Sequence, residues 1–353
     1  MRNGTSPAGP ILEAKDISIV FGHIDHGGTV AVDRASLALA ESPPRILSIV
    51  GESGSGKTTL ARSLLGLSKP TRGEALYRGK NIYDLSKDEM KTFRTDVQAV
   101  FQDPYGIYNP FYKIDRVFDM TIKQFKLASS KAEKRDLIEE ALRAVNLRPP
   151  DVIGRHPHQL SGGERQRIML ARAYLLRPKV IIADEPISML DVAVRATLMN
   201  IFLDFKERYG MSTLFITHDL SAAYYLGGDI MVMSRGRAVE DGPVDDVMAT
   251  PAHPYTRLLL GSIPSPDPDH EWDQIALSPR QLPADKVHSR ARCLFAERCP
   301  HVMDMCVESR PPQYEIGKQH AACFLYHPEA SSLEIVPKST TARRAEAAAT
   351  AVP

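Results

Sequence analysis

The sequence predicts an α/β fold with a parallel sheet at its centre, and three observations lead to that prediction. Short apolar runs at residues 180–183 and 213–217 fit strands that are buried in a parallel sheet. A further apolar run, residues 46–50, leads directly into a glycine-rich loop. A helical pattern follows that loop over residues 59–67. Strand, glycine-rich loop and helix in this order are typical of α/β domains that bind phosphate groups.

The loop fits the pattern Gly-x-x-x-x-Gly-Lys-Ser/Thr at every fixed position, and it reads Gly51-Glu52-Ser53-Gly54-Ser55-Gly56-Lys57-Thr58. Glycine permits positive φ and a close approach of the backbone to a ligand. We expect Lys57 to reach the β- and γ-phosphates of a nucleotide and the Thr58 hydroxyl to hold Mg²⁺. The alternative is a Gly/Ser-rich turn without a ligand, but the flanking strand and helix favour the phosphate site.

Composition indicates a globular chain that is long enough for two domains. The 353 residues are 43% hydrophobic and 25% charged, and the formal net charge is +1. Because this charge provides no basic field, we expect no nucleic-acid partner. No apolar run approaches the roughly 20 residues that span a bilayer, and residues 1–7 lack the apolar core of a secretory signal. We therefore expect a cytosolic chain that reaches a membrane only through partners.

Other elements follow from local patterns. Residues 11–20 and 30–40 are predicted strands of an antiparallel layer, separated by the turn-rich residues 22–29. A short strand at 74–77 ends at a turn, and a last strand is predicted at 230–234. A charged helix over 131–145 has apolar residues at three- and four-residue spacing, which predicts one buried face. That face consists of Leu137, Ile138, Ala141, Leu142 and Val145.

Two further strand ends carry groups suited to phosphate chemistry. Asp184 and Glu185 close the apolar run at 180–183, and paired acids at a buried strand end are costly unless a cation receives them. Asp184 is suited to hold Mg²⁺ and Glu185 to orient or deprotonate an attacking water. His218 follows the run at 213–217 and is a candidate sensor of the γ-phosphate. The alternatives are a polar turn for the acids and a structural hydrogen bond for the histidine.

A second helix start resembles an anion site. The segment Leu160-Ser161-Gly162-Gly163-Glu164-Arg165-Gln166-Arg167 opens a helix, so its first residues would present uncapped N–H groups to an anion. Since the chain already has one phosphate loop, we expect this second site to face a nucleotide that a partner subunit holds.

In the order of these elements the sequence resembles the ATPase subunits of ABC transporters. Gly51 to Thr58 resembles the Walker A loop, and Gln102 resembles the Q-loop residue that also contacts Mg²⁺. Ser161 to Glu164 resembles the signature, Asp184 and Glu185 the Walker B acids, Ser188 to Asp191 the D-loop, and His218 the switch histidine. Phe21 lies where this family places an aromatic that stacks on adenine, although a lone aromatic could equally belong to the core.

The resemblance implies a RecA-like P-loop ATPase core with an antiparallel β layer, an inserted helical subdomain near residues 103–175, and a head-to-tail pair. It implies catalysis by Glu185, His218 and Gln102, with Mg²⁺ held by Thr58, Gln102 and Asp184. Glu164 replaces the commoner Gln of the signature, and Ile187 and Met189 replace the usual Thr and Ala before the D-loop. The residues implied to bind ATP are Phe21, Gly51, Ser53, Gly54, Ser55, Gly56, Lys57, Thr58, Thr59, Ser161, Gly162, Gly163 and Glu164.

Four cysteines follow the ATPase core, at positions 293, 299, 306 and 323. In a reducing compartment they suit a tetrahedral metal or an iron–sulfur cluster, and their spacing leaves that choice open. Together with the segments 252–259 and 320–323 they resemble the C-terminal extension of the oligopeptide/dipeptide subfamily of ABC ATPases. That resemblance implies a [4Fe–4S] cluster on Cys293, Cys299, Cys306 and Cys323. Zinc is the second choice, and free cysteines packed as small hydrophobic residues are the third.

We expect four segments in the chain: a flexible N-terminus at 1–10, the nucleotide-binding domain at 11–262, a small Cys-rich C-terminal extension at 263–330 and a disordered tail at 331–353. Residues 105–118 contain aromatic side chains that suit a docking surface for a permease, with ordinary packing of the helical subdomain as the alternative. These aromatics are Tyr105, Tyr108, Phe111, Tyr112 and Phe118.

The resulting expectation is an ATP-hydrolysing subunit that powers import of oligopeptides, dipeptides or a related solute. The implied partners are a second ABC ATPase subunit, expected to be a paralogue, two transmembrane permease subunits and an extracytoplasmic solute-binding protein. The expected location is the cytoplasmic face of the inner membrane, as a peripheral protein. The alternatives are an oligosaccharide importer, a soluble ABC ATPase of DNA repair or translation, and an iron–sulfur sensor whose ATPase serves regulation.

Overall fold

The computed structural model describes residues 9–22, 28–103, 105–263 and 289–328. The chain divides into two compact units, Met1–Ala238 and Val239–Pro353. The predicted division at residue 262 falls inside the second unit, beside residues that the structure does not describe, so it stays a prediction. The flexible N-terminus expected at 1–10 lies almost wholly outside the described residues, and the disordered tail expected at 331–353 lies wholly outside them.

An antiparallel sheet forms one layer of the first unit, as the sequence predicts. Strand β1 (Pro10–Phe21) pairs with β2 (Thr29–Ala40) and with β4 (Arg72–Tyr77), which pairs with β5 (Lys80–Asn81). A two-residue turn, Arg78-Gly79, joins the last two strands, and both of its residues have positive φ. Such turns match the twist of paired strands and therefore favour a tight hairpin.

A parallel sheet lies at the centre of the first unit and confirms the predicted fold class. Its strands follow the order β9-β3-β8-β7-β6, and their registers are parallel throughout. Most of their side chains are buried on both faces, which is why the sequence shows apolar runs rather than alternation. The strands are β3 (Ile46–Val50), β6 (Val97–Val100), β7 (Val180–Asp184), β8 (Ser212–Thr217) and β9 (Asp229–Ser234).

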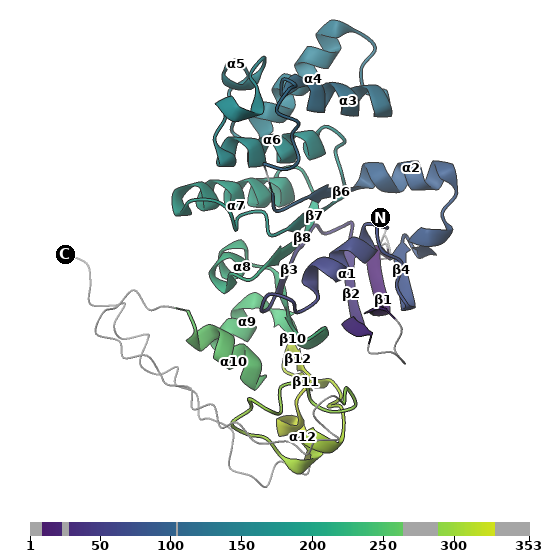
Figure 1. Cartoon of the computed structure of the whole chain (residues 1–353), viewed down its shortest axis with the longest axis vertical. Helices are drawn as coiled ribbons and strands as arrows, with labels where there is room; N and C mark the ends of the chain where they lie inside the picture. Colours follow the sequence, from purple (N-terminus) through teal and green to yellow (C-terminus); the bar gives the residue numbers. More distant parts are fainter. Residues whose placement is uncertain (1–8, 23–27, 104, 264–288, 329–353) are drawn as a thin grey trace, which may run out of the picture. The chain divides into compact units, whose positions relative to one another are not determined.

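Helices alternate with many of these strands in the sequence, and Figure 1 shows their order along the chain. Helix α1 begins at Lys57 as the loop pattern requires, but it ends at Leu64, three residues before the predicted end, because Gly66 turns the chain at φ 70°. No helix in the described parts is both long and apolar enough to cross a membrane. The helices are α1 (Lys57–Leu64), α2 (Lys87–Asp96), α3 (Asp115–Phe125), α4 (Lys131–Ala144), α5 (Pro149–Val152), α6 (Gly162–Tyr174), α7 (Val192–Glu207) and α8 (Leu220–Leu226).

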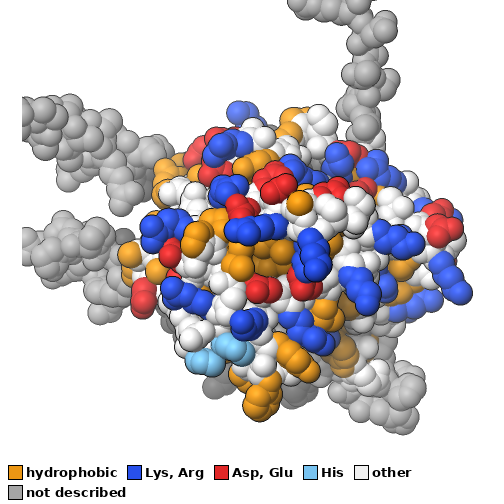
Figure 2. Space-filling view, turned by 90° about the horizontal axis from the view of Figure 1, so that it is seen from above, with side chains coloured by type: hydrophobic (Ala, Val, Ile, Leu, Met, Phe, Trp, Pro, Cys, Tyr) orange, Lys and Arg blue, Asp and Glu red, His pale blue; other side chains and the backbone are white. Residues whose placement is uncertain are grey.

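Helices α3 to α6 share one core, which contains Phe118, Ala141, Leu142 and Ile168. The predicted buried face of α4 is confirmed, with Leu137 packed only partly against that core. Two of the five aromatics expected on a docking surface belong to the core instead: Tyr108 is 6% exposed and Phe118 is fully buried. Figure 2 shows basic and acidic side chains intermingled on one face of the molecule, with apolar side chains between them.

The second unit is built on a small antiparallel sheet. Strand β10 (Arg237–Pro243) pairs with β12 (Gln319–Ala321), which pairs with β11 (Tyr314–Ile316). The buried Glu240 side chain accepts hydrogen bonds from the backbone N–H groups of Ala252 and His253, at 2.7 and 2.9 Å. These bonds tie β10 to the start of α10. The helices of this unit are α9 (Val244–Ala249), α10 (Pro254–Gly261) and α12 (Asp304–Glu308).

Candidate functional site

The glycine loop joins β3 to α1 and leaves the start of that helix uncapped. Gly56 is the N-cap residue, has φ 99°, and supplies no side chain to bond the first N–H groups of α1. A Cβ atom at Gly56 would lie 2.2 Å from the carbonyl oxygen of Ala31, so no other residue fits there without a backbone shift. The free N–H groups and the helix dipole therefore make a site for an anion.

Lys57 lies inside this loop and is bound to it. Its Nζ donates to the carbonyl oxygens of Gly51 and Glu52, at 2.8 and 2.9 Å, and contacts Ser55 Oγ at 3.3 Å. Burial lowers the pKa of Lys57, while Glu185, Asp184 and Glu52 oppose that shift. The loop thus holds the ammonium group beside the uncapped end of α1. The remaining loop residues, Ser53 and Gly54, are exposed, and Thr59 is half-buried in α1.

Thr58 and Asp184 connect the loop to the end of β7. The Thr58 hydroxyl donates to Asp184 Oδ1 at 3.0 Å. Burial is the main cause that raises the pKa of Asp184, and the neighbouring Glu185 adds to it, while the bond from Thr58 opposes it. A carboxylate and a hydroxyl in contact at this position are oxygen ligands of the kind that Mg²⁺ prefers.

Glu185 and His218 are also in contact. His218 Nδ1 lies 3.0 and 2.9 Å from the two carboxylate oxygens of Glu185. Glu185 has φ 50°, a conformation that non-glycine residues rarely adopt, and its N–H donates to the Ile216 carbonyl oxygen of β8. This backbone bond holds the strained residue in place, with its side chain on His218, so the structure brings two of the three predicted catalytic groups together.

Gln102 and Phe21 are placed by the ends of their strands. Gln102 is exposed and follows β6 by two residues, and β6 is paired in parallel with β7, so both strands end at one edge of the sheet. Phe21 is the last residue of β1 and is 54% exposed, which excludes the alternative of a core aromatic. The roles of Gln102 and Phe21 in binding nucleotide stay predictions.

The signature segment forms a closed cap at the start of α6. Ser161 is the N-cap, and its Oγ accepts from the Glu164 N–H at 3.2 Å. In return, one Glu164 carboxylate oxygen accepts from both the N–H and the hydroxyl of Ser161, each at 2.8 Å. This reciprocal arrangement is a capping box, in which two otherwise unpaired N–H groups are satisfied within the chain.

Packing inside the chain separates the two signature glycines. A Cβ at Gly163 would lie 2.4 Å from Cγ1 of Val194 in α7, and a Cβ at Gly162 would lie 2.7 Å from the Tyr105 hydroxyl. Val194 is stiff, whereas the end of a tyrosine side chain can move. Gly163 is therefore fixed by the contact between α6 and α7, independently of any ligand.

The sequence interpretation missed a brace behind the glycine loop. The Gly236 N–H donates to the Ser55 carbonyl oxygen at 3.0 Å, and the Asp33 N–H donates to the Gly236 carbonyl oxygen at 2.8 Å. The Asp33 side chain in turn pairs with the buried Arg237 at 2.7 Å. No local sequence pattern could reveal this brace, because it joins residues about two hundred positions apart.

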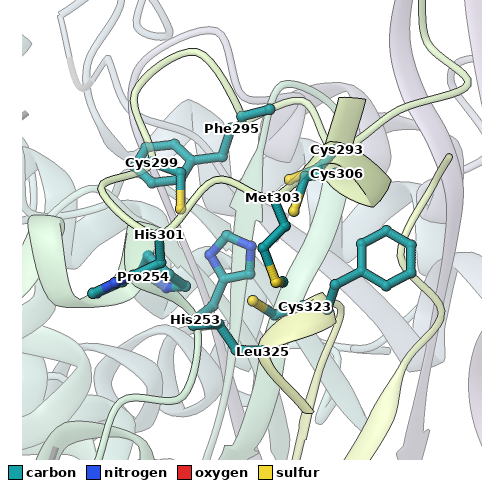
Figure 3. A pocket seen from close by; sticks show the side chains of 12 residues that line it. His253, Pro254, Cys293, Phe295, Cys299, His301, Met303, Cys306, Cys323 and Leu325 are labelled. Atoms are coloured by element: carbon teal, nitrogen blue, oxygen red, sulfur yellow. The ribbon is translucent and has the colours of Figure 1, made fainter. Parts of the chain in front are cut away.

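In the second unit, the four cysteines line a single cavity, together with His253 and Met303. Figure 3 shows their thiols directed toward the space that holds the His253 ring. Burial raises the pKa of Cys299 and of Cys323 to about 12, so these thiols stay protonated unless a cation compensates. Among the described residues no three Cys, His, Asp or Glu side chains are gathered to hold one metal ion. The donor types suit a metal or cluster, but their arrangement is not that of a formed metal site.

His253 lies in the segment 252–259, and the sequence did not reveal its place in the cavity. It is almost fully buried, caps α10 by accepting the Tyr255 N–H at Nδ1, and stacks at a tilt on Phe295 with ring centroids 5.9 Å apart. Burial, with a smaller effect of Arg257, lowers the pKa of His253 to about 3, so the ring is neutral. Its place directly before Pro254, where helices often begin, was the available signal.

Comparisons with known proteins agree with this geometry. A family model described as "ABC transporter" matches residues 34–188, and one described as "Oligopeptide/dipeptide transporter, C-terminal region" matches residues 239–306. The di/tripeptide transport ATP-binding protein DppF of Pseudomonas aeruginosa is 39% identical, over 79% of this chain and 85% of that protein. The oligopeptide transport ATP-binding protein OppF of Escherichia coli is 38% identical, over 84% of this chain and 88% of that protein.

Solved structures show the same fold. The cbiO1 protein of Clostridium perfringens, part of an ABC transporter complex, superposes with a TM-score of 0.59 at 25% identity, over 68% of this chain and 91% of that one. An ATP-binding cassette solved as a dimer in a post-hydrolysis state, bound to ADP and Pi, has a TM-score of 0.58 at 28% identity, over 66% and 98%. The chain therefore belongs to the ATP-binding subunits of ABC transporters and is an ABC-type ATPase with a C-terminal region of the oligopeptide/dipeptide transporter type.

Proposed function

We propose that this ATPase powers the import of oligopeptides or dipeptides through partner permeases. The proposal rests on one observation: Lys57 in the glycine loop, the Thr58–Asp184 pair and the Glu185–His218 pair occur together. The same chain carries a C-terminal region of the oligopeptide/dipeptide transporter type. The relatives named for transport of di-, tri- and oligopeptides support peptides as the cargo. No residue of the ATPase is expected to touch the cargo, so oligosaccharides are the second candidate.

Within the ATP site, each group has a proposed role. Gly51 to Thr59 hold the phosphates, with Lys57 exchanging its loop carbonyls for phosphate oxygens, and Phe21 stacks on adenine. Thr58, Gln102 and Asp184 hold Mg²⁺, which when bound neutralises phosphate charge. Glu185 accepts the proton of the attacking water, and His218 keeps the carboxylate oriented.

The second half of the ATP site is proposed to come from a partner ATPase. The start of α6 in this chain would in turn contact the ATP that the partner binds. The uncapped start of α1 supplies one anion site and the start of α6, at Ser161 to Glu164, supplies another. One nucleotide lies between the two sites when two subunits meet head to tail. The cassette solved as a dimer with ADP and Pi supports pairing of two such subunits.

Transport requires permeases and a solute-binding protein, and a surface of the helical subdomain is proposed to meet a permease at the cytoplasmic face of the membrane. Tyr105, Phe111 and Tyr112 are 54%, 86% and 45% exposed. Arg165 lies over the ring of Tyr105 at 4.5 Å, and Arg116 lies over the ring of Tyr112 at 4.0 Å. Exposed aromatics, two of them stacked with arginines, are suited to anchor a partner helix.

The cavity of the second unit is proposed to hold a [4Fe–4S] cluster on Cys293, Cys299, Cys306 and Cys323. Support comes from the four thiols that share the cavity and from their apolar surroundings, which include Phe295 and Phe324. The cluster, when bound, would accept four thiolates and compensate the burial that keeps these groups protonated. Zinc is the alternative for the same donor set.

The transport proposal is tested with the assembled transporter in proteoliposomes. Wild type should couple ATP hydrolysis to uptake of a labelled dipeptide or tripeptide. Glu185→Gln should lose turnover by about a hundredfold or more and retain MgATP binding, because it keeps the shape of the side chain but removes the proton acceptor. Uptake of an oligosaccharide but of no peptide would show that the transporter imports oligosaccharides. Continued ATP hydrolysis by Glu185→Gln would show that Glu185 is not the proton acceptor.

The cluster proposal is tested on the chain purified without oxygen. We expect a brown protein with absorbance near about 400 nm and iron and sulfide in equal amounts, and we expect loss of both on replacing Cys299 and Cys323 by serine. Zinc alone in the metal analysis would establish the alternative, and the absence of any metal would leave the thiols as structural residues.

A further inference from the structure

The carboxylate of Glu164 occupies the anion-binding end of α6. It accepts both the N–H and the hydroxyl of Ser161, so the side-chain donor that the signature offers to a phosphate is already bound within the chain. Arg167 and Arg155 lie near enough to act on this carboxylate. Burial opposes ionisation, but the bonds from Ser161 and these arginines outweigh it and lower the pKa of Glu164, so the group is ionised at neutral pH.

We propose that Glu164 is a positioning residue that competes with the γ-phosphate of the partner-held ATP for Ser161, and thereby weakens closure of that ATP site. The inference rests on the proposed head-to-tail arrangement. Phosphate and carboxylate both require the same hydroxyl and the same positive helix end, and two anions there repel each other. Closure therefore includes a step in which the Ser161 hydroxyl leaves Glu164 Oε2 for the phosphate.

A glutamine at this position weakens the competition, because its neutral amide oxygen holds the Ser161 hydroxyl less strongly than a carboxylate and does not repel phosphate. Its carbonyl oxygen can still accept the Ser161 N–H, so the helix cap is kept. Its amide carries no charge and can donate a hydrogen bond to phosphate, which a carboxylate cannot do. The substitution Glu164→Gln therefore removes the negative charge at the signature but keeps the cap that stabilises α6.

The chain offers a matched control at another helix start. Ser86 and Glu89 form the same capping box at α2, with Ser86 N–H to Glu89 Oε2 at 2.8 Å and Glu89 N–H to Ser86 Oγ at 3.3 Å. This second box lies outside the signature. Glu89→Gln therefore makes the same substitution in the same kind of cap, away from the proposed ATP site, although it also removes the ion pair of Glu89 with Lys80 at 2.8 Å.

The test measures kcat and KM for ATP in the assembled transporter, with wild type, Glu164→Gln, Glu89→Gln and Ser161→Ala. We expect Glu164→Gln to lower KM for ATP by about threefold to tenfold, with kcat changed by less than about twofold. We expect Ser161→Ala to raise KM, since the hydroxyl that binds phosphate is lost, and Glu89→Gln to leave both constants unchanged.

Each other result decides a different point. An unchanged KM in Glu164→Gln, with a raised KM in Ser161→Ala, overturns the competition but keeps the head-to-tail site. An equal fall of KM in Glu89→Gln also overturns it, because the effect would then belong to capping boxes in general. Wild-type constants in Ser161→Ala show that the start of α6 meets no nucleotide, so the proposed function itself fails.

Discussion

For the proposed ATP site, the sequence predicted which residues take part but not which atoms those residues contact. The sequence predicted Lys57, Thr58, Asp184, Glu185 and His218, because each has a fixed place after a strand or in the loop. It could not predict that Lys57 donates to its own loop carbonyls, or that Glu185 adopts φ 50° to meet a histidine 33 positions further on. Such contacts depend on strand neighbours that are distant in the chain.

Glu164 shows the same limit at the signature. The sequence revealed that it replaces a glutamine, whereas the structure reveals what the change does: its carboxylate takes both polar groups of Ser161. A departure from a motif acquires a physical meaning only when its hydrogen-bond partners are known.

Elements were predicted best where one face or a whole strand is buried. The pairs β1–β2 and β7–β8 and helix α4 agree with their predicted ranges within one or two residues. Strand β6 was not predicted, because four residues are too few to show a period, although it places Gln102. Helix α7 was not predicted either, since its apolar residues, from Val192 to Phe205, are spread around the helix.

Packing of α6 on α7 gives a prediction at this scale. Gly163→Ala should lower the free energy of unfolding by about 1–3 kcal/mol, because its Cβ would lie 2.4 Å from Val194 Cγ1. In the Val194→Ala background the same change should cost nothing or stabilise, since alanine favours a helix over glycine by about 1 kcal/mol. Chemical denaturation of wild type, the two single variants and the double variant gives the coupling free energy between positions 163 and 194.

Gly162→Ala is the control for that cycle. Its Cβ would come too close to the end of the Tyr105 side chain, which can rotate away, and would make an ordinary contact with Leu190 Cδ2 at 3.7 Å, so its cost should be smaller and independent of Val194. An equal loss at Gly162 and Gly163, or no rescue by Val194→Ala, would show that the α6–α7 contact does not select the second glycine.

At the scale of the whole molecule, half of each ATP site is proposed to lie on another subunit. The first unit holds the glycine loop before α1 and, separately, the start of α6 at Ser161 to Glu164, which is proposed to bind a second anion. The second unit places four cysteines around one cavity. The sequence predicted both sets of residues and that the four cysteines gather at one site, but it did not predict the closed cap on α6, for which the Ser-x-x-Glu spacing of residues 161–164 was the available signal.

The most direct test of this account is a structure of the assembled transporter that carries Glu185→Gln and is trapped with MgATP. We predict a triphosphate that touches Gly51 to Thr58 of this chain, with the start of α6 from the opposite ATPase on its γ-phosphate, and the reverse arrangement at the second nucleotide. A structure in which Ser161 and Gly163 lie far from every triphosphate would contradict the account.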